Sequence, residues 1–171
     1  MTGLNTKKLT LTAMFTALVF LGTRFLAFPG PLPPGYINLG DSIIILCAVL
    51  IGAPSAAFAG SVGSALADMT YPGGIIFAPF TFIVKGLVGL VAGLISKRDS
   101  MVSIVIAAIA AGLIMAGGYF LAEWLVLPLI DETFGMAFAI TELPFNFIQA
   151  GINSTLAIVL SAALRKKVNL I

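Results

Sequence analysis

Charged side chains are scarce in this sequence: Asp, Glu, Lys and Arg together make up 9% of its 171 residues, whereas hydrophobic residues make up 60%. Soluble domains carry a charge on about a quarter of their residues, because a surface exposed to water demands polar coverage. This composition excludes a soluble globular domain and predicts a protein solvated by a lipid bilayer. The net charge of +2 is too small to indicate a nucleic-acid partner.

Residue types that commonly carry catalysis or metal binding are also missing or isolated. The sequence has no histidine, which excludes Ser-His and Cys-His nucleophile pairs and histidine metal ligands. The single cysteine, Cys47, lies in an apolar run and is expected to be a buried small side chain. No GxxxxGK(S/T) phosphate loop occurs, so the chain alone is not expected to hydrolyse ATP. We predict no catalytic residue, metal site or cofactor in this chain, although an enzyme that uses carboxylates alone stays open.

The apolar residues fall into runs that are suited to crossing a membrane. A spanning helix needs about 20 apolar residues, and fewer when other helices surround it. Six runs are separated by turn-forming or charged segments: residues 9–28, 42–50, 55–69, 75–96, 101–127 and about 143–164. The second and third runs could also form one broken hairpin. The sequence predicts an all-α membrane protein with six transmembrane helices in a single domain, residues 1–171.

The basic residues set the expected orientation, because Lys and Arg concentrate in cytoplasmic loops. With six spans, these residues all fall on one side: Lys7, Lys8, Lys97, Arg98, Arg165, Lys166 and Lys167. The opposite loops, residues 29–41, 71–74 and 128–139, contain no Lys or Arg. We therefore expect both termini in the cytoplasm of a multi-pass protein in a plasma membrane of prokaryotic type.

Short side chains recur at helical spacing in the third and fourth runs. They are Ala56, Gly60, Ser64 and Asp68, each four residues apart, and Gly86, Gly89 and Gly93. Small residues let helix backbones approach closely in a bilayer, where no hydrophobic effect drives helices together. We expect tight packing inside the protein at these positions.

Ionisable side chains within spans are costly and mark candidate functional sites. They are Arg24, Asp41, Asp68, Lys85, Glu123 and Glu142. At a rise of about 1.5 Å per residue, Lys85 lies near mid-depth and the others lie nearer the outer side. This distribution predicts a polar cavity that is reached from outside. We expect Lys85 to pair with Asp68 or Glu142, or to donate to a ligand oxygen.

A polar stripe follows the sixth run. Glu142, Asn146, Gln149 and Asn153 recur at i, i+4, i+7 and i+11 and share one helical face, with Pro144 expected in the first turn. Because such a stripe is unfavourable in lipid, it must face protein, water or ligand. We expect ligand contact for Glu142 and Asn146, near the outer mouth. For the deeper Gln149 and Asn153, interhelical hydrogen bonding is an equal alternative.

The outer loops add further polar and aromatic groups, namely Tyr36, Asn38 and Tyr71. The loop of residues 29–41 contains four prolines, which make it stiff and suited to a lid over a small polar ring; a plain connector is the alternative. The candidate binding residues are thus Asn38, Asp68, Tyr71, Lys85, Glu142, Asn146 and Gln149.

Four segments of the chain have a familiar pattern. They read LTLTAMFTALVFLGT, INLGDSIIILCAVLIGAPSAAFAGSVGSALADMTYPGG, FAPFTFIVKGLVGLVAGLI and TELPFNFIQAGINSTLAIVL. In this order and spacing, over nearly the whole chain, the sequence resembles the S components, the substrate-binding subunits, of energy-coupling-factor (ECF) vitamin transporters. It is most similar to the hydroxymethylpyrimidine or pyridoxine type, and next to the riboflavin type.

The resemblance implies a vitamin binder without its own motor. Such subunits join a transmembrane T component and two ATP-binding cassette ATPases, which consume the ATP, and topple in the bilayer to deliver substrate. The family's AxxxA signature, which contacts the T component, maps onto Ala13 and Ala17; packing within the chain could explain the same pair. The family's pocket lies at the outer side, and the single Trp124 makes an aromatic thiamin-type pocket a poorer match. A non-transport membrane enzyme or scaffold is the alternative class, and it requires no small-molecule binding.

Overall fold

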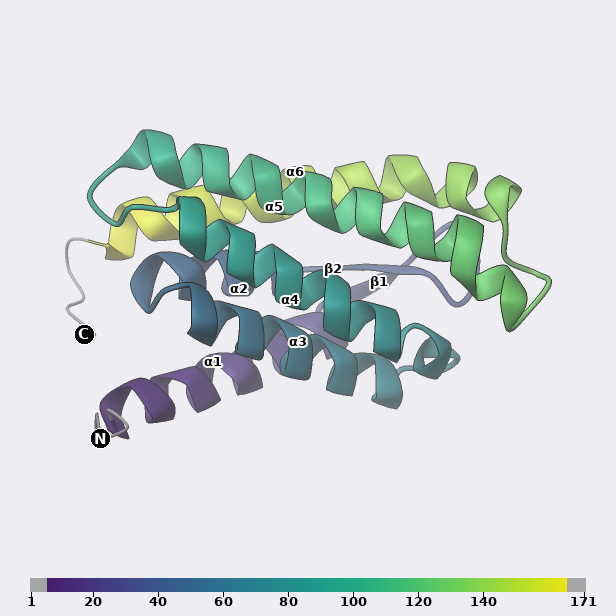
Figure 1. Cartoon of the computed structure of the whole chain (residues 1–171), viewed down its shortest axis with the longest axis horizontal. Coiled ribbons are helices and arrows are strands. Elements are labelled where there is room, and N and C mark those ends of the chain that lie inside the picture. The colour runs from purple at the N-terminus through teal and green to yellow at the C-terminus, as the bar shows by residue number, and fades with distance from the viewer. Residues whose placement is uncertain (1–5, 166–171) are drawn as a thin grey trace.

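The computed structural model describes residues 6–165, which form six α-helices and one short β-hairpin (Figure 1). The elements are α1 (Thr6–Arg24), β1 (Ala27–Pro29), β2 (Tyr36–Asn38), α2 (Gly40–Leu50), α3 (Ala53–Thr70), η1 (Gly74–Ile76), α4 (Ala78–Ile95), α5 (Met101–Leu121), η2 (Ala122–Val126), η3 (Leu127–Leu129) and α6 (Met136–Leu164). Here η1 and η3 are 3-10 turns, and η2 is a π-helical turn that follows α5. The antiparallel pairing of β1 with β2 adds a small sheet to the expected helical bundle.

Large apolar side chains cover the outside of the bundle, whereas small and polar ones fill its interior. Leu94 and Val102 are 72% and 70% exposed, while Ala56, Ser64 and Ala107 have no exposed surface. Three helical stretches are long and apolar enough to cross a bilayer by themselves: Ala78–Ile95, Met101–Leu129 and Met136–Leu164. This distribution suits lipid as the surrounding solvent and confirms the prediction of a membrane helical bundle.

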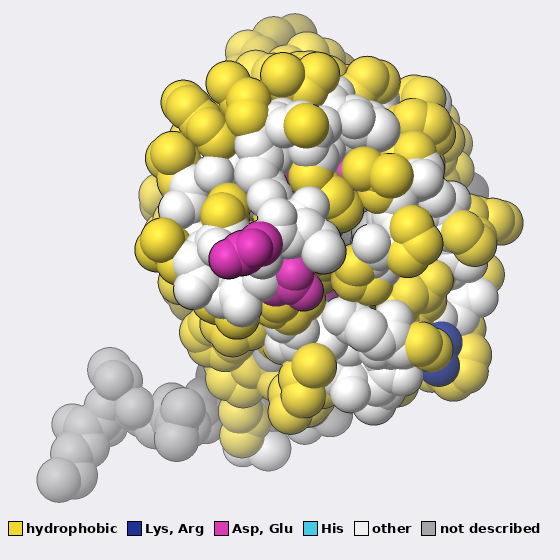
Figure 2. Space-filling model, turned by 90° about the vertical axis from the view of Figure 1, so that its right-hand side faces the viewer, with side chains coloured by type: hydrophobic (Ala, Val, Ile, Leu, Met, Phe, Trp, Pro, Cys, Tyr) yellow, Lys and Arg dark blue, Asp and Glu magenta, His cyan; other side chains and the backbone are white. Residues whose placement is uncertain are grey.

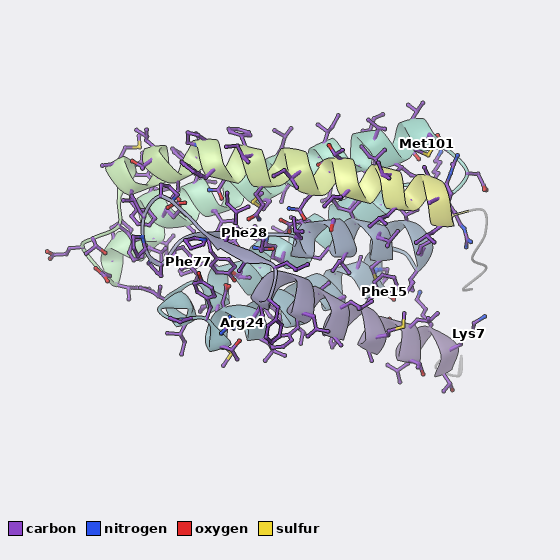
Figure 3. All side chains as sticks on the ribbon, turned by 180° about the vertical axis from the view of Figure 1, so that it is seen from behind. Lys7, Phe15, Arg24, Phe28, Phe77 and Met101 are labelled. Atoms are coloured by element: carbon purple, nitrogen blue, oxygen red, sulfur yellow. The ribbon has the colours of Figure 1, made fainter. Side chains whose placement is uncertain are left out.

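The basic segments gather at one end of the bundle. The helix α1 begins and α6 ends at this end (Figure 1), and Lys7 lies at the same end as Met101, the first residue of α5 (Figure 3). Arg98 and Arg165 exchange hydrogen bonds with each other's main-chain carbonyls, at 2.8 and 3.0 Å. The expected grouping is therefore confirmed for the described residues; Lys166 and Lys167 lie outside them. That this end faces the cytoplasm stays a prediction.

Three helix boundaries differ from the expected ones. The first helix ends at Arg24 rather than near residue 28, because a residue that precedes proline, here Phe28, disfavours the helical conformation. The regular helix α5 ends at Leu121 instead of continuing to residue 127. The helix α6 begins at Met136, not near residue 143, after Gly135 turns the chain with a φ of 140°. The expected position of Pro144 in the first turn is consequently wrong, since it lies inside α6.

The helix α2 is short and enclosed by protein. Its 11 residues span about 16 Å at the usual rise, roughly half of the hydrocarbon core of about 30 Å. Every residue of α2 except Ile43 is buried, and the helix packs against α1, α3, α4 and α6. Protein therefore shields its ends from lipid. The second and third apolar runs form two helices joined at Gly52, and the shorter one does not cross the membrane unaided.

Glycines bring α3 and α4 into backbone contact. A Cβ atom at Gly89 would overlap the carbonyl oxygen of Ala56, and one at Gly60 would overlap the carbonyl oxygen of Lys85. The tight packing expected from the short side chains is confirmed at these positions. It also places the α4 side chains close to the protein centre.

A buried ion pair links α2 and α4. The Lys85 ammonium nitrogen lies 2.6 and 2.8 Å from the two carboxylate oxygens of Asp41, and their side chains are 2% and 5% exposed. The Gln149 amide of α6 donates to the same carboxylate at 2.9 Å. The expected pairing of Lys85 with Asp68 or Glu142 is wrong, because enclosure of α2 brings its first turn directly against α4.

We predict that Gly89→Ala lowers the free energy of unfolding by about 1–3 kcal/mol, because the added methyl group must displace the Ala56 backbone. Thermal unfolding in detergent, followed by circular dichroism, measures the change. Gly151→Ala in α6 is the matched control, because nothing lies within 4 Å of the added atom. It should keep or raise the Tm. Equal Tm values for the two variants would contradict the backbone contact.

Removing one charge of the buried ion pair should be far more damaging than removing both. We expect Lys85→Met to destabilise the protein by about 3–5 kcal/mol, because it leaves the Asp41 carboxylate buried without a counter-charge. The double variant Lys85→Met with Asp41→Leu should recover most of that loss. Denaturant unfolding of both variants provides the comparison, and a double variant no more stable than Lys85→Met would refute the expectation.

Candidate ligand-binding site

A narrow cavity lies between the helices toward the end of the bundle opposite the described terminal segments. It encloses about 470 Å³ of empty space, part of it open to solvent. The space is narrow, and we call it the slot. Its lining comes from every helix except α2, and from the hairpin loop: Thr23, Pro34, Gly35, Tyr36, Asn38, Asp68, Phe77, Thr81, Lys85, Tyr119, Glu123, Glu142, Asn146 and Gln149.

Six of the seven candidate binding residues line this cavity. They are Asn38, Asp68, Lys85, Glu142, Asn146 and Gln149. The seventh, Tyr71, lines the neighbouring open depression instead, and its ring stacks on that of Tyr36 with centroids 4.2 Å apart. The structure therefore assembles most of the predicted residues, and it gives Tyr71 a supporting position instead of a lining one.

Asp68 occupies one wall of the slot. The Tyr36 hydroxyl donates to one of its carboxylate oxygens, Oδ1. The other oxygen, Oδ2, is buried and makes no hydrogen bond of normal geometry with a described residue, although the Thr81 hydroxyl lies close to this carboxylate. The stack on Tyr71 restrains the Tyr36 ring, so one side of the carboxylate is held and the other is left available.

The polar stripe of α6 divides into two functions. At the end nearer the ion pair, the side-chain oxygen of Gln149 accepts a hydrogen bond from the backbone N–H of Asn38 at 2.8 Å. The side chain of Asn153 accepts from the backbone N–H of Ser42 and donates to the backbone carbonyl of Asn38, both at 2.8 Å. Interhelical hydrogen bonding, one of the two expected alternatives, thus accounts for Asn153, while Gln149 combines it with a place in the cavity wall.

The outer half of the stripe faces the cavity. Glu142 accepts from the Leu32 amide nitrogen at 3.1 Å, which fastens the loop of residues 29–35 to α6. The amide nitrogen of Asn146, Nδ2, is buried without a partner among the described residues. Pro34 and Gly35 also line the cavity, so this loop forms part of its wall; that it acts as a lid stays a prediction.

Several lining residues were not among the predicted ones. Thr81 and Tyr119 form a hydrogen bond of 2.8 Å across α4 and α5, and Phe77 and Thr23 complete the wall. The sequence does not mark these residues as candidates, because Thr, Phe and Tyr occur throughout apolar helices. Glu123 did carry a signal, as an acid within a span, but its inward direction depends on the π-helical turn η2.

The end of the bundle opposite the basic segments carries acidic groups close to the cavity. Figure 2 looks onto this end of the bundle, where acidic side chains gather beside the centre and basic atoms show at the edge. Asp131 lines an open depression that shares Pro34 and Gly35 with the cavity. The amide N–H and the hydroxyl of Thr133 donate to Asp131 and hold its pKa below the usual range, so this carboxylate stays charged at neutral pH.

Comparisons with known proteins agree with this architecture. The family model described as the S component of the ECF-type riboflavin transporter matches residues 3–166. The thiamine precursor transporter HmpT of Lactococcus lactis subsp. cremoris is 34% identical over 163 residues, which cover 95% of this chain and 90% of that protein.

A second relative is similar over a shorter part of the chain. A protein of Pyrococcus woesei, described as an uncharacterized protein in the gap 3′ region, is 34% identical over 134 residues, covering 77% of this chain and 84% of that protein. The match to the family model covers almost every residue of the bundle, including all the lining residues of the cavity. This multi-pass plasma-membrane chain therefore belongs to the family of ECF-type riboflavin transporter S components.

Proposed function

We propose that this chain captures one small water-soluble vitamin or vitamin precursor from outside the cell, with hydroxymethylpyrimidine or pyridoxine favoured. The observation that carries the proposal is the slot itself, which gathers carboxylate, amide and hydroxyl groups inside an otherwise apolar bundle. Membrane-buried polar groups are retained where they serve a ligand or a pathway. The HmpT relative, 34% identical over 95% of this chain, is named for a thiamine precursor, and this supports the choice.

Riboflavin is the second candidate, because the matching family model carries its name. Mass spectrometry of the small molecule released from detergent-purified protein distinguishes the candidates. Release of no small molecule, together with no binding of any of these vitamins, would favour the non-transport scaffold instead.

We propose that delivery depends on partner subunits. The family is a transporter subunit and not an enzyme, and this sequence has no phosphate-binding loop of its own. A T component and two ATP-binding cassette ATPases would supply the ATP-driven step, with the basic end of the bundle in the cytoplasm. Uptake should accordingly require co-expression of those subunits.

The proposed docking face for the T component is the outer side of α1. Ala13 and Ala17 are both exposed, and they lie one turn apart on the same stripe. Two methyl-sized side chains leave a shallow groove that a partner helix can approach closely. Their exposure favours docking over the alternative of packing within the chain.

Asn146→Leu should weaken binding of hydroxymethylpyrimidine or pyridoxine about tenfold, because a hydrogen bond from the buried amide to the ligand is lost. Titration calorimetry on detergent-purified protein measures the affinity. Phe147→Leu is the control, since Phe147 is 50% exposed on the lipid side, and it should bind like the wild type. An unchanged affinity in Asn146→Leu would remove Asn146 from the site.

Ala17→Trp should abolish co-purification with the T component and uptake, because the bulky ring fills the groove between the two alanines. Ligand affinity and Tm should stay at wild-type values. The control is Leu18→Trp, which is also exposed but lies about 100° around the helix. Complete assembly with Trp at both Ala13 and Ala17 would contradict docking, and a joint fall in Tm and affinity would indicate internal packing.

A further inference from the structure

Four buried polar atoms that line the cavity have no hydrogen-bond partner within residues 6–165. They are Thr23 Oγ1, Asp68 Oδ2, Glu123 Oε2 and Asn146 Nδ2. Asp68 and Glu123 are 3% and 4% exposed, so water at the molecular surface does not compensate them. Because buried polar atoms in folded proteins are almost always paired, this group of open positions around one slot points to a bound molecule that completes them.

The charges around the slot are unbalanced. Acidic side chains outnumber basic ones by four to one when the wall residues and the Lys85 partner are counted together: Asp41, Asp68, Glu123 and Glu142 against Lys85. The Lys85 ammonium group is already bound by both oxygens of Asp41. A ligand that brings N–H donors or positive charge therefore relieves the imbalance, whereas one that brings oxygen acceptors increases it.

The burial of Glu123 coincides with a local change of helix geometry. The π-helical turn η2 buries Ala122 and Glu123, while the three residues that follow them are exposed. Such turns rotate the helix face relative to a regular α-helix and occur frequently at functional sites. Tyr36 holds Asp68 by one oxygen only. Both acids thus line the slot, and each keeps one carboxylate oxygen without a hydrogen-bond partner among the described residues.

We propose that the site selects an aromatic nitrogen heterocycle that carries an amino group, with Asp68 and Glu123 accepting its N–H donors and Asn146 donating to a ring nitrogen or hydroxyl. This inference rests on the proposed function and names the substrate class of the same site. An aromatic amino group presents two N–H donors, which two carboxylates can share, and hydrogen bonds to a carboxylate are the stronger kind. A ring with oxo groups at that edge instead points oxygen lone pairs at the carboxylates.

This matching of donors to acceptors ranks the candidate vitamins. The amino form of hydroxymethylpyrimidine offers the required edge. Pyridoxine has hydroxyl groups but no amino group, and the dioxo ring of riboflavin presents mainly acceptors. Sites built to hydrogen-bond one group reject analogues that lack it more strongly than apolar pockets reject a change of size.

The test compares two rings of the same size. Binding of hydroxymethylpyrimidine and of its oxo analogue, in which oxygen replaces the amino group, is measured by calorimetry on the full-length protein in detergent. The wild type should bind the amino ring at least about tenfold more tightly. Glu123→Gln should weaken binding of the amino ring about 10- to 100-fold. It should leave binding of the oxo ring unchanged or strengthen it, because the new amide can donate to that oxygen.

The control variant is Glu132→Gln, an exposed acid in the loop before α6, which should change neither affinity. Equal losses for both rings in Glu123→Gln would make Glu123 a structural residue and overturn the inference, as would an unchanged affinity for the amino ring. If Glu123→Gln does not give folded protein, Asp68→Asn supplies the same comparison. A wild type that prefers pyridoxine or the oxo ring would overturn the inference and leave the proposed function standing. Failure to bind any single-ring vitamin would reject both.

Discussion

The ion pair between Lys85 and Asp41 is the interaction on which the arrangement of the bundle centre depends. An isolated charge at this depth is strongly unfavourable, so α2 and α4 must keep both carboxylate oxygens within 2.8 Å of the ammonium nitrogen. Gln149 adds α6 to the same carboxylate. Its neighbour on the stripe, Asn153, ties the backbone of α2 and of the hairpin to α6. The hairpin that covers the cavity is thus anchored through the same polar centre.

Short side chains make this centre geometrically attainable. Gly60 and Gly89 let α3 and α4 meet at the backbone, which leaves room beside α4 for the enclosed helix α2. In a soluble protein the hydrophobic effect would favour large apolar residues inside. Here the large apolar residues face outward, where lipid solvates them as well as a protein core would, and packing and hydrogen bonds hold the helices together instead.

The cavity shares its wall with the polar centre but has a different balance of interactions. The polar groups of the centre are paired with one another, whereas those toward the outer end, Asp68, Glu123 and Asn146, each keep an open position. The paired polar groups fix the closed end of the site, whereas the lining atoms without partners can still form hydrogen bonds. Such a site is suited to holding a small polar molecule in one orientation, because the protein groups need little reordering when the molecule binds.

The sequence by itself determined the membrane class and the number of helices, because composition, run length and helical periodicity depend only on residue type and spacing. It also identified six of the cavity residues, since an acid, lysine or amide inside an apolar run is conspicuous. Only the tertiary structure decided that Lys85 pairs with Asp41, that Tyr71 supports the wall and that η2 turns Glu123 inward. These outcomes depend on which helices become neighbours and on local departures from regular helix geometry, and a one-dimensional pattern of residue types contains neither.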